Sequence, residues 1–406
     1  MIKKTLIKKW KIFILIKLKI KSSRFDVKKV GVAMIIFLYL LLFIVIIKYL
    51  ILKVDSTTNV VNFILLFSIV IYAVLKIYNN QLTSNWGTDQ YTYYYQFFLP
   101  LRGVSWPQFW MGNIGDKEFG FKLVLWLIMQ VKVLSFLQFQ IVTFIIETIP
   151  IFLVSIFINK NKNIDIIIFS FIMYPFFVNG ATNVLRQGLA VGVLMAAYLW
   201  TIENINTSTV IKPISIASVL VAASFHQTAV ILALLWIVVV FTRKKIKIAY
   251  FWLIAFIFTI LALTNINQNL FGSIGSLFSD NYDLYINPDA RINYGSSSKN
   301  SFIIISWLIA IILNFLLKKV DNINKNTAEL LLKQYLGSMS AFFAFSFIAF
   351  ADRVGMYAWA IAPMIAFYYI DNIKNEQEKR ILLVLIPIFS ILIGYGMSSG
   401  SYFVNR

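Results

Sequence analysis

Apolar stretches of about 20 residues recur in this chain from residue 31 to near the C-terminus, separated by short polar loops. A helix needs roughly 20 mostly apolar residues to cross the hydrocarbon core of a bilayer. Hydrophobic residues make up 60% of the sequence and charged residues only 13%, too few for a soluble surface along most of the chain. The pattern predicts an all-α, polytopic membrane protein of about 12–13 transmembrane helices.

These stretches define one membrane domain over residues 30–400, with outer loops at residues 79–117 and 264–300. Ahead of it, residues 1–29 carry eleven basic side chains and one acid, Asp26, which predicts a basic amphipathic segment on the cytoplasmic surface of the membrane. The predicted spans are residues 31–52, 60–78, 118–136, 137–158, 164–181, 183–202, 211–225, 227–241, 248–264, 301–317, 331–350, 354–370 and 381–397.

The chain has a net charge of +20, and most of its basic residues lie in loops between apolar stretches. Such residues fix the orientation of membrane proteins and contact anionic lipids, so no nucleic-acid partner is expected. With no Cys and a single His, the sequence has neither a thiolate nor a His cluster for a metal ion. We therefore expect no cofactor.

Three basic loops, residues 243–247, 318–333 and 374–380, fall on the same side of the membrane if the intervening spans cross it. Basic loops favour the cytoplasmic side. The polar residues then predicted to lie outside are Arg186, His226, Asp352, Arg353 and those of the loop 264–300.

The first half of the chain allows two topologies. If the basic N-terminus is inside and every predicted span crosses, the loop at residues 79–117 lies in the cytoplasm. If the helix at residues 118–136 instead dips into the outer leaflet without crossing, that loop is external. We favour the external loop, because its polar residues then share one face with Arg186, His226 and Arg353.

Residues 85–98, NWGTDQYTYYYQFF, place Tyr93 and Phe97 four and eight residues after Asp89. On a helix this spacing makes one aromatic face beside an acid. An aromatic belt at the membrane interface with a capping Asp has the same pattern. It also suits sugars, whose apolar faces stack on rings while their hydroxyls bond to acids.

Charged residues also stand at the starts of apolar helices. Glu118, in the segment DKEFGF, interacts with the helix dipole or acts as a general base whose pKa apolar surroundings raise toward neutrality. Arg186, in the segment NVLRQGLA, extends to the membrane surface or offers its guanidinium to phosphate oxygens.

The only histidine, His226, lies between two spans in the segment SFHQTA, where it is a structural hydrogen-bonding residue or a catalytic one. Asp352 and Arg353 form an interfacial ion pair or belong to the outer site. Asp280 and Asp283 have a spacing that suits a divalent cation, but two acids in a polar loop are a weak signal for a metal.

In this order the segments resemble the EpsG family of bacterial exopolysaccharide polymerases, which are Wzy-like, over about residues 60–360. The matched pattern is a Gly-Thr-Asp loop followed by aromatics, an acid-x-Gly-Phe helix start, an Asn-x-x-Arg-Gln helix start, a Phe-His turn and a late Arg. One position departs from it. Family members commonly have an Arg shortly before the Gly-Thr-Asp, where this chain has Asn85 and Trp86, so Arg102 or Arg186 would have to replace it.

The resemblance implies a membrane glycosyltransferase that polymerises undecaprenyl-diphosphate-linked oligosaccharides into exopolysaccharide, capsule or O-antigen at the outer face of the bacterial cytoplasmic membrane. Asp89 or Glu118 would be the base, and His226 would supply an orienting hydrogen bond. Arg186 and Arg353 would bind the diphosphate. The other substrate-binding residues expected are Tyr93, Asn183, Gln187 and Arg102. A chain-length regulator and a flippase are the expected protein partners.

Other functional classes share parts of this pattern. A flippase for the same lipid-linked sugars would bury ionisable residues near the middle of the membrane and often have two similar halves. Here the notable polar residues gather near one face, and the two halves are unlike. A polysaccharide ligase or an acyltransferase remains an alternative of the enzyme class.

Overall fold

The computed structural model describes residues 43–44, 47, 88–111, 118–159, 163–177, 184–205, 217, 220–243, 245–275, 299–348 and 351–398. Within these ranges the regular structure is helical, apart from an isolated β-bridge between Val320 and Ile373. This confirms the prediction of an all-α membrane protein. Residues 1–29, the span predicted at 60–78, and most of the spans predicted at 31–52 and 211–225 lie outside the described residues.

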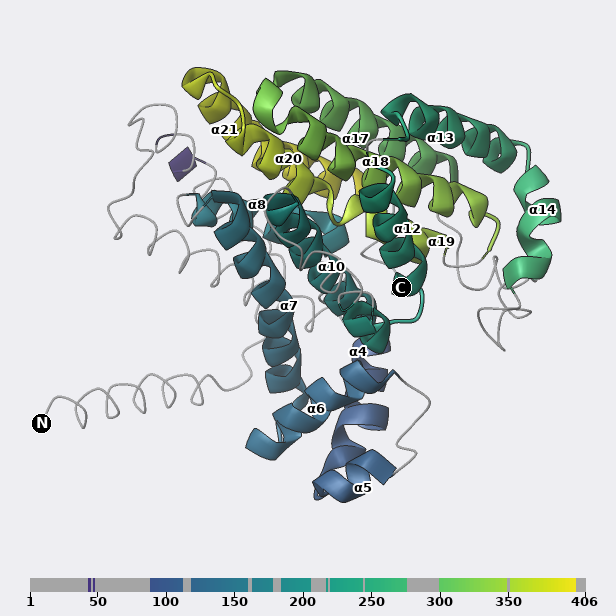
Figure 1. Ribbon diagram of the computed structural model, residues 1–406. Coiled ribbons are helices and arrows are strands. Elements are labelled where there is room, and N and C mark those ends of the chain that lie inside the picture. The colour runs from purple at the N-terminus through teal and green to yellow at the C-terminus, as the bar shows by residue number, and fades with distance from the viewer. Residues whose placement is uncertain are drawn as a thin grey trace, which may run out of the picture.

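The elements follow one another as a chain of helices of very different lengths (Figure 1). In order they are α4 Thr88–Thr92, the π-helical turn η2 Tyr93–Phe98, the 3-10 turn η3 Leu99–Leu101, α5 Trp106–Met111, α6 Phe119–Val131, α7 Phe136–Asn159, α8 Ile164–Met173, α10 Leu185–Asn204, α12 Ala229–Phe241, α13 Ile248–Leu263, α14 Ile266–Gly275, α17 Lys299–Lys319, α18 Asn322–Ala344, α19 Ala351–Trp359, α20 Ala362–Asp371 and α21 Glu376–Ser398.

Among the described residues, three helices are long and apolar enough to cross a membrane, at Phe136–Ser155, Leu185–Asn204 and Asn300–Lys319. A fourth candidate is the pair α13 and α14, which are bent by 102° relative to each other. The bend follows Asn265, whose positive φ of 60° breaks the helix, and α14 occupies the start of the predicted loop 264–300. The predicted total of about 12–13 spans stays a prediction.

Several predicted spans are divided or shorter in the structure. α8 ends at Met173, because Tyr174 precedes Pro175 and is extended, as the proline favours. The span predicted at 354–370 consists of α19 and α20, with Pro363 in the first turn of α20.

The span predicted at residues 118–136 is also shorter, because α6 ends at Val131. Its 13 residues correspond to about 20 Å, less than the roughly 30 Å of a hydrocarbon core. The next helix, α7, starts from a capping box: the Ser135 N–H donates to Gln138 Oε1 (3.0 Å), and the Gln138 N–H donates to Ser135 Oγ (3.4 Å). This local signal, S-x-x-Q, separates the two helices.

Residues 318–333 were predicted to form a basic loop. This prediction is wrong for most of the segment, because α18 begins at Asn322. Asp321 caps this helix by accepting a hydrogen bond from the Asn324 N–H (2.8 Å). Hydropathy alone does not predict this helix start, because the capping residue lies within a polar stretch.

The three basic segments meet at one end of the bundle. Lys333 Nζ donates to the backbone oxygen of Arg243 (3.4 Å), and Lys319 forms an ion pair with Glu378. The first contact joins the end of α12 to the middle of α18, and the second joins the end of α17 to the start of α21. The segments predicted to share the cytoplasmic side therefore share one end of the structure.

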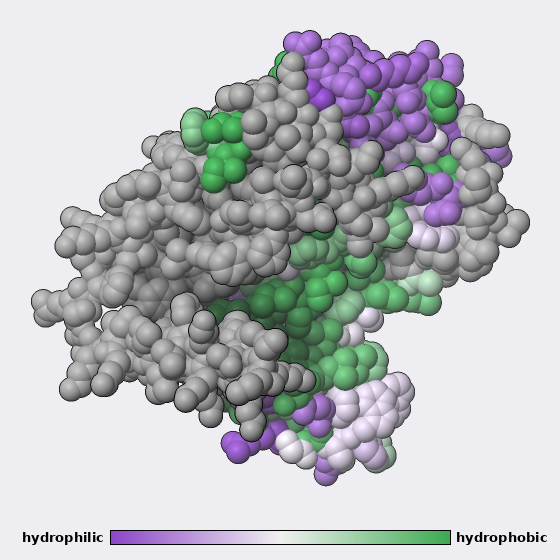
Figure 2. Space-filling view, turned by 90° about the vertical axis from the view of Figure 1, so that its left-hand side faces the viewer, coloured by the Kyte–Doolittle hydropathy of each residue, from purple (hydrophilic) through white to green (hydrophobic). Residues whose placement is uncertain are grey.

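α10 connects this basic end to the opposite end of the bundle. At its C-terminal end the Ile205 oxygen accepts a hydrogen bond from Arg243 Nη1 (3.2 Å), while Arg186 stands at its N-terminal end. Its 20 residues correspond to about 30 Å, the thickness of a hydrocarbon core. Figure 2 shows hydrophilic residues at the top, a hydrophobic band below them and a mixed surface at the bottom, where Figure 1 places α5.

Two clusters of buried apolar side chains hold the bundle. The larger is built around α18, whose faces pack against α12, α13, α17 and α19. The smaller joins η2, α5 and α6 to the starts of α7 and α10, with the rings of Phe98, Phe121 and Phe139 fully buried. Phe225 packs against both clusters, so the segment before α12 lies where they meet.

Gly192 permits the close crossing of α7 and α10, where its missing side chain leaves room for Pro150. A Cβ at Gly192 would lie 2.5 Å from Pro150 Cγ, so Gly192→Ala is expected to destabilise the protein by about 1–3 kcal/mol through overpacking. Gly272→Ala in α14 is the control, because nothing lies within 4 Å of its Cβ. Thermal unfolding in detergent measures both; an unchanged Tm for Gly192→Ala would contradict the packing.

Candidate functional site

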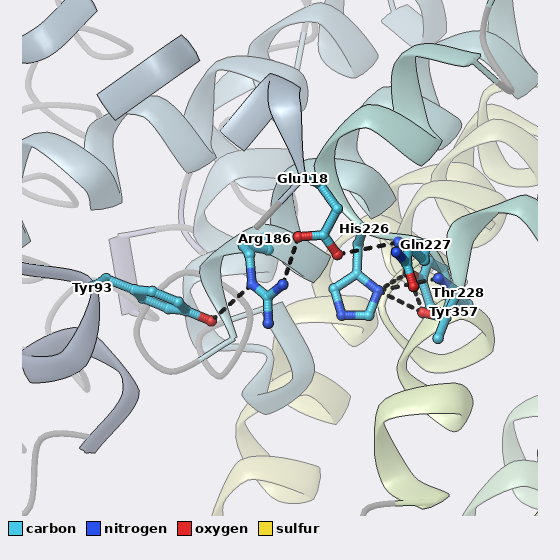
Figure 3. Close-up of polar contacts among 7 residues, drawn as sticks. All are labelled: Tyr93, Glu118, Arg186, His226, Gln227, Thr228 and Tyr357. Carbon is cyan, nitrogen blue, oxygen red and sulfur yellow. Dashed lines mark hydrogen bonds and ion pairs between the residues drawn. The ribbon is translucent and has the colours of Figure 1, made fainter. Parts of the chain in front are cut away.

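The starts of three helices converge at the end of the bundle opposite the basic segments. Glu118 directly precedes α6, Arg186 lies in the first turn of α10, and His226 precedes α12 (Figure 3). Helix N-termini carry unpaired N–H groups and the positive end of the helix dipole. The site therefore has a built-in preference for negative charge.

An ion pair between Glu118 and Arg186 lies at the centre of the site. Arg186 Nη1 donates to Glu118 Oε2 at 2.5 Å, and the two side chains are only 11% and 16% exposed. The other carboxylate oxygen, Oε1, accepts the backbone N–H of Gln227 at 3.4 Å. Glu118 thus connects the N-termini of α10 and α12.

Gly120 allows α6 to approach the segment that leads into α12. A Cβ at Gly120 would lie 2.9 Å from the backbone oxygen of Ser224 and would overlap the Ser224 hydroxyl. Only glycine leaves this space empty. The close approach that it allows brings Glu118, two residues before Gly120, within reach of the Gln227 N–H. The glycine of the acid-x-Gly-Phe pattern thus has a packing role that the sequence pattern did not reveal.

The structure corrects the predicted titration of Glu118. Burial acts to raise the pKa of this carboxyl, but the charge of Arg186 and the hydrogen bonds from the Glu118 backbone and from Arg186 hold its pKa below the ordinary value of 4.5. The prediction of a pKa raised toward neutrality is therefore wrong, because it considered the apolar surroundings without the cation. Glu118 is a carboxylate at neutral pH.

Tyr93 holds the other edge of the Arg186 guanidinium. Its hydroxyl accepts Arg186 Nε–H at 3.4 Å, and the guanidinium carbon lies 5.9 Å from the centre of its ring. Tyr93 itself is 5% exposed and packs edge-on against Phe121. Among the described residues Arg186 Nη2 makes no hydrogen bond, so this part of the guanidinium is available to an anion.

His226 is held by Thr228 and Tyr357, neither of which sequence reasoning selected. The Thr228 hydroxyl lies 2.7 Å from His226 Nδ1 and 2.9 Å from the Tyr357 hydroxyl, and the Thr228 N–H donates to Nδ1 at 3.3 Å. Tyr357 is buried in α19. The S-F-H-Q-T segment contained a signal for Thr228, which is the residue before α12; no local pattern pointed to Tyr357.

Gln187, the residue after Arg186, is hydrogen-bonded to Arg353. The side chain of Gln187 is buried, and its Nε2 donates to the backbone oxygen of Arg353 in α19. This bond ties α10 to α19 next to Arg186. The predicted substrate-binding roles of both residues stay predictions.

The remaining predicted residues differ in how far the structure describes them. Arg102 is exposed at the end of η3 and makes no hydrogen bond or ion pair with Glu118 or His226 in the described part of the chain. Asp89 lies in α4. Asn183, Asp280 and Asp283 lie outside the described residues.

A helical bundle with apolar spans defines an integral membrane protein, and in this one a charged site lies at the starts of three helices. The model of the EpsG family matches residues 77–403, most of the chain, and the chain belongs to this family. This confirms the resemblance and supports a polymerase-like role in exopolysaccharide synthesis. No curated protein and no solved structure matches the chain.

The pairing of Glu118 with Arg186 predicts a coupled effect on stability. Arg186→Gln leaves a partly buried carboxylate without its cation and is expected to cost roughly 3 kcal/mol of unfolding free energy. In the double variant Glu118→Gln/Arg186→Gln the loss is expected to be smaller than the sum of the two single losses. Additive losses in thermal unfolding would contradict the pair.

The same pair also determines how stability depends on pH. Because the folded-state pKa of Glu118 is lowered, its stabilising effect is present above the unfolded value near 4.5 and is lost as the pH falls through the folded-state pKa. The Tm difference between wild type and Glu118→Gln should therefore be largest near neutral pH and shrink on acidification.

Proposed function

We propose that the protein is a membrane polymerase that joins oligosaccharide repeat units carried on undecaprenyl diphosphate, at the outer face of the bacterial cytoplasmic membrane. The observation that carries this proposal is the convergence of Glu118, Arg186 and His226 from distant parts of the chain at the starts of three helices. EpsG family membership supports the polymerase class.

The charges of the site favour a diphosphate as ligand. Three helix N-termini and the remaining N–H groups of Arg186 present positive potential, while Glu118 neutralises only one positive charge. A guanidinium offers paired donors that match phosphate oxygens. These groups stabilise the negative charge that develops on the leaving diphosphate.

The polarity of the bundle supports an outer location for the site. α10 has the length of a hydrocarbon core and separates Arg186 from the segments around Arg243, Lys319 and Lys333. Basic segments favour the cytoplasmic side, so the opposite end faces outward. The shortness of α6 supports an external loop at residues 79–117, since a helix of about 20 Å does not span the membrane.

In the reaction we propose, a sugar hydroxyl of one lipid-linked unit attacks the anomeric carbon of another. A new glycosidic C–O bond forms as the bond to the diphosphate breaks, and the lipid diphosphate leaves with the electron pair. The hydroxyl proton passes to Glu118, whose oxygens keep lone pairs beside their bonds to Arg186 and Gln227. Glu118 is ionised at neutral pH, but its lowered pKa makes it a weak base, so it takes the proton only as the new C–O bond forms and the hydroxyl becomes acidic.

Purified protein with lipid-linked repeat units tests the reaction. We expect a ladder of lengthening products from wild type, a loss of at least 100-fold in rate for Arg186→Ala, and partial activity for Arg186→Lys, which keeps the charge but loses the planar donors. Lys245→Ala, exposed near the basic end, is the control. Translocation alone would indicate a flippase, and one transfer to a different acceptor would indicate a ligase.

The topology is tested with single cysteines, because the chain contains none of its own. Gln108 and Lys132 are exposed and flank α6, so Gln108→Cys and Lys132→Cys should react with an impermeant reagent from the same, outer side. Gln377→Cys, exposed in the first turn of α21 at the basic end, should react only from inside. Labelling of positions 108 and 132 from opposite sides would mean that α6 crosses the membrane.

A further inference from the structure

The contacts of His226 Nδ1 determine where this ring carries its proton. A backbone N–H can only donate, and the Thr228 N–H points at Nδ1 from 3.3 Å. Nδ1 is therefore an acceptor, and in the neutral ring the proton lies on Nε2. A proton on Nδ1 would face the Thr228 N–H directly.

Two hydroxyl groups extend this arrangement away from the ring. The Thr228 hydroxyl lies 2.7 Å from Nδ1 and donates to it, which leaves its oxygen to accept from the Tyr357 hydroxyl at 2.9 Å. Tyr357 is 2% exposed and also lies 3.5 Å from Nδ1. The chain of donors runs in one direction, from Tyr357 through Thr228 to His226, and each bond polarises the next.

We propose that Thr228 and Tyr357 are positioning residues, which keep His226 neutral with its proton on Nε2, so that the imidazole serves as a hydrogen-bond donor and not as a base. In the part of the chain that the structure describes, the titratable groups drawn beside the ring are Glu118 before α6, Arg186 on α10 and Tyr357 on α19 (Figure 3). Glu118 has its own cation in Arg186, so it does not require a charged imidazole as a partner.

The assignment of the proton stands on geometry alone, whereas its use in catalysis rests on the proposed polymerase function. In that reaction the Nε2–H donates to an oxygen of the diphosphate, alongside Arg186, and Glu118 takes the hydroxyl proton. In this scheme Glu118 is the base, and Arg186 and His226 are the two hydrogen-bond donors. In this proposal a phosphate oxygen accepts the Nε2–H. The N-termini of the three helices favour the same class of ligand.

Because His226 is the only histidine, ¹⁵N-histidine NMR of the full-length protein reports on this ring alone. We expect wild type to show a protonated Nε2 and an unprotonated Nδ1. Thr228→Val keeps the backbone donor but loses the hydroxyl, and should raise the population protonated on Nδ1 about fivefold. Thr228→Ser should restore the wild-type spectrum, and Tyr357→Phe should shift the Nδ1 signal.

A wild-type ring protonated on Nδ1 or on both nitrogens would overturn the proposal, as would identical spectra for Thr228→Val and wild type. The product ladder separates the two claims. If NMR gives the expected result and no ladder forms, the polymerase function fails and the proton assignment stands. If a ladder forms, Thr228→Val should lower kcat about fivefold with KM unchanged; an unchanged kcat would overturn the catalytic part.

Discussion

The ion pair between Glu118 and Arg186 organises the end of the bundle that holds the candidate site. It joins side chains 68 positions apart, and each partner also holds a second element: Glu118 accepts the Gln227 N–H before α12, and Arg186 donates to Tyr93 in η2. Both charges are mostly excluded from water, so removing either leaves the other without compensation. The pair makes the site costly to disrupt, and it also ionises the carboxylate that the proposed reaction uses.

The direction of the helices gives this end its chemical character. α6, α10 and α12 all begin here, so their dipoles add to the remaining donors of Arg186 and favour a polyanion. The basic segments lie at the far end of α10, where they match the charge preference of the cytoplasmic side. The bundle thus separates the end where three helices start from the end that carries the basic segments.

The residues around the charges act mainly by positioning them. Gly120 removes a side chain so that α6 can approach Ser224, Gln187 ties α10 to the backbone of Arg353, and Thr228 links His226 to Tyr357. These contacts explain why small and amide residues accompany the charged ones in the motifs of the chain. A polar site inside an apolar bundle needs such neighbours, because unsatisfied polar groups are costly there.

The sequence by itself determined the membrane class, since repeated apolar stretches of spanning length leave only helices as a stable backbone. It also selected Glu118 and Arg186 as charged residues at helix starts and His226 as a titratable residue between two spans. It also held a local signal, the Ser135–Gln138 capping box, for the break after α6. Only the tertiary structure decided that Glu118 pairs with Arg186, that its pKa falls, and that Tyr357 reaches Thr228 from 129 positions away. The reason is physical: hydropathy and capping act within a few residues, whereas a pKa and a hydrogen-bond relay depend on which helices pack together.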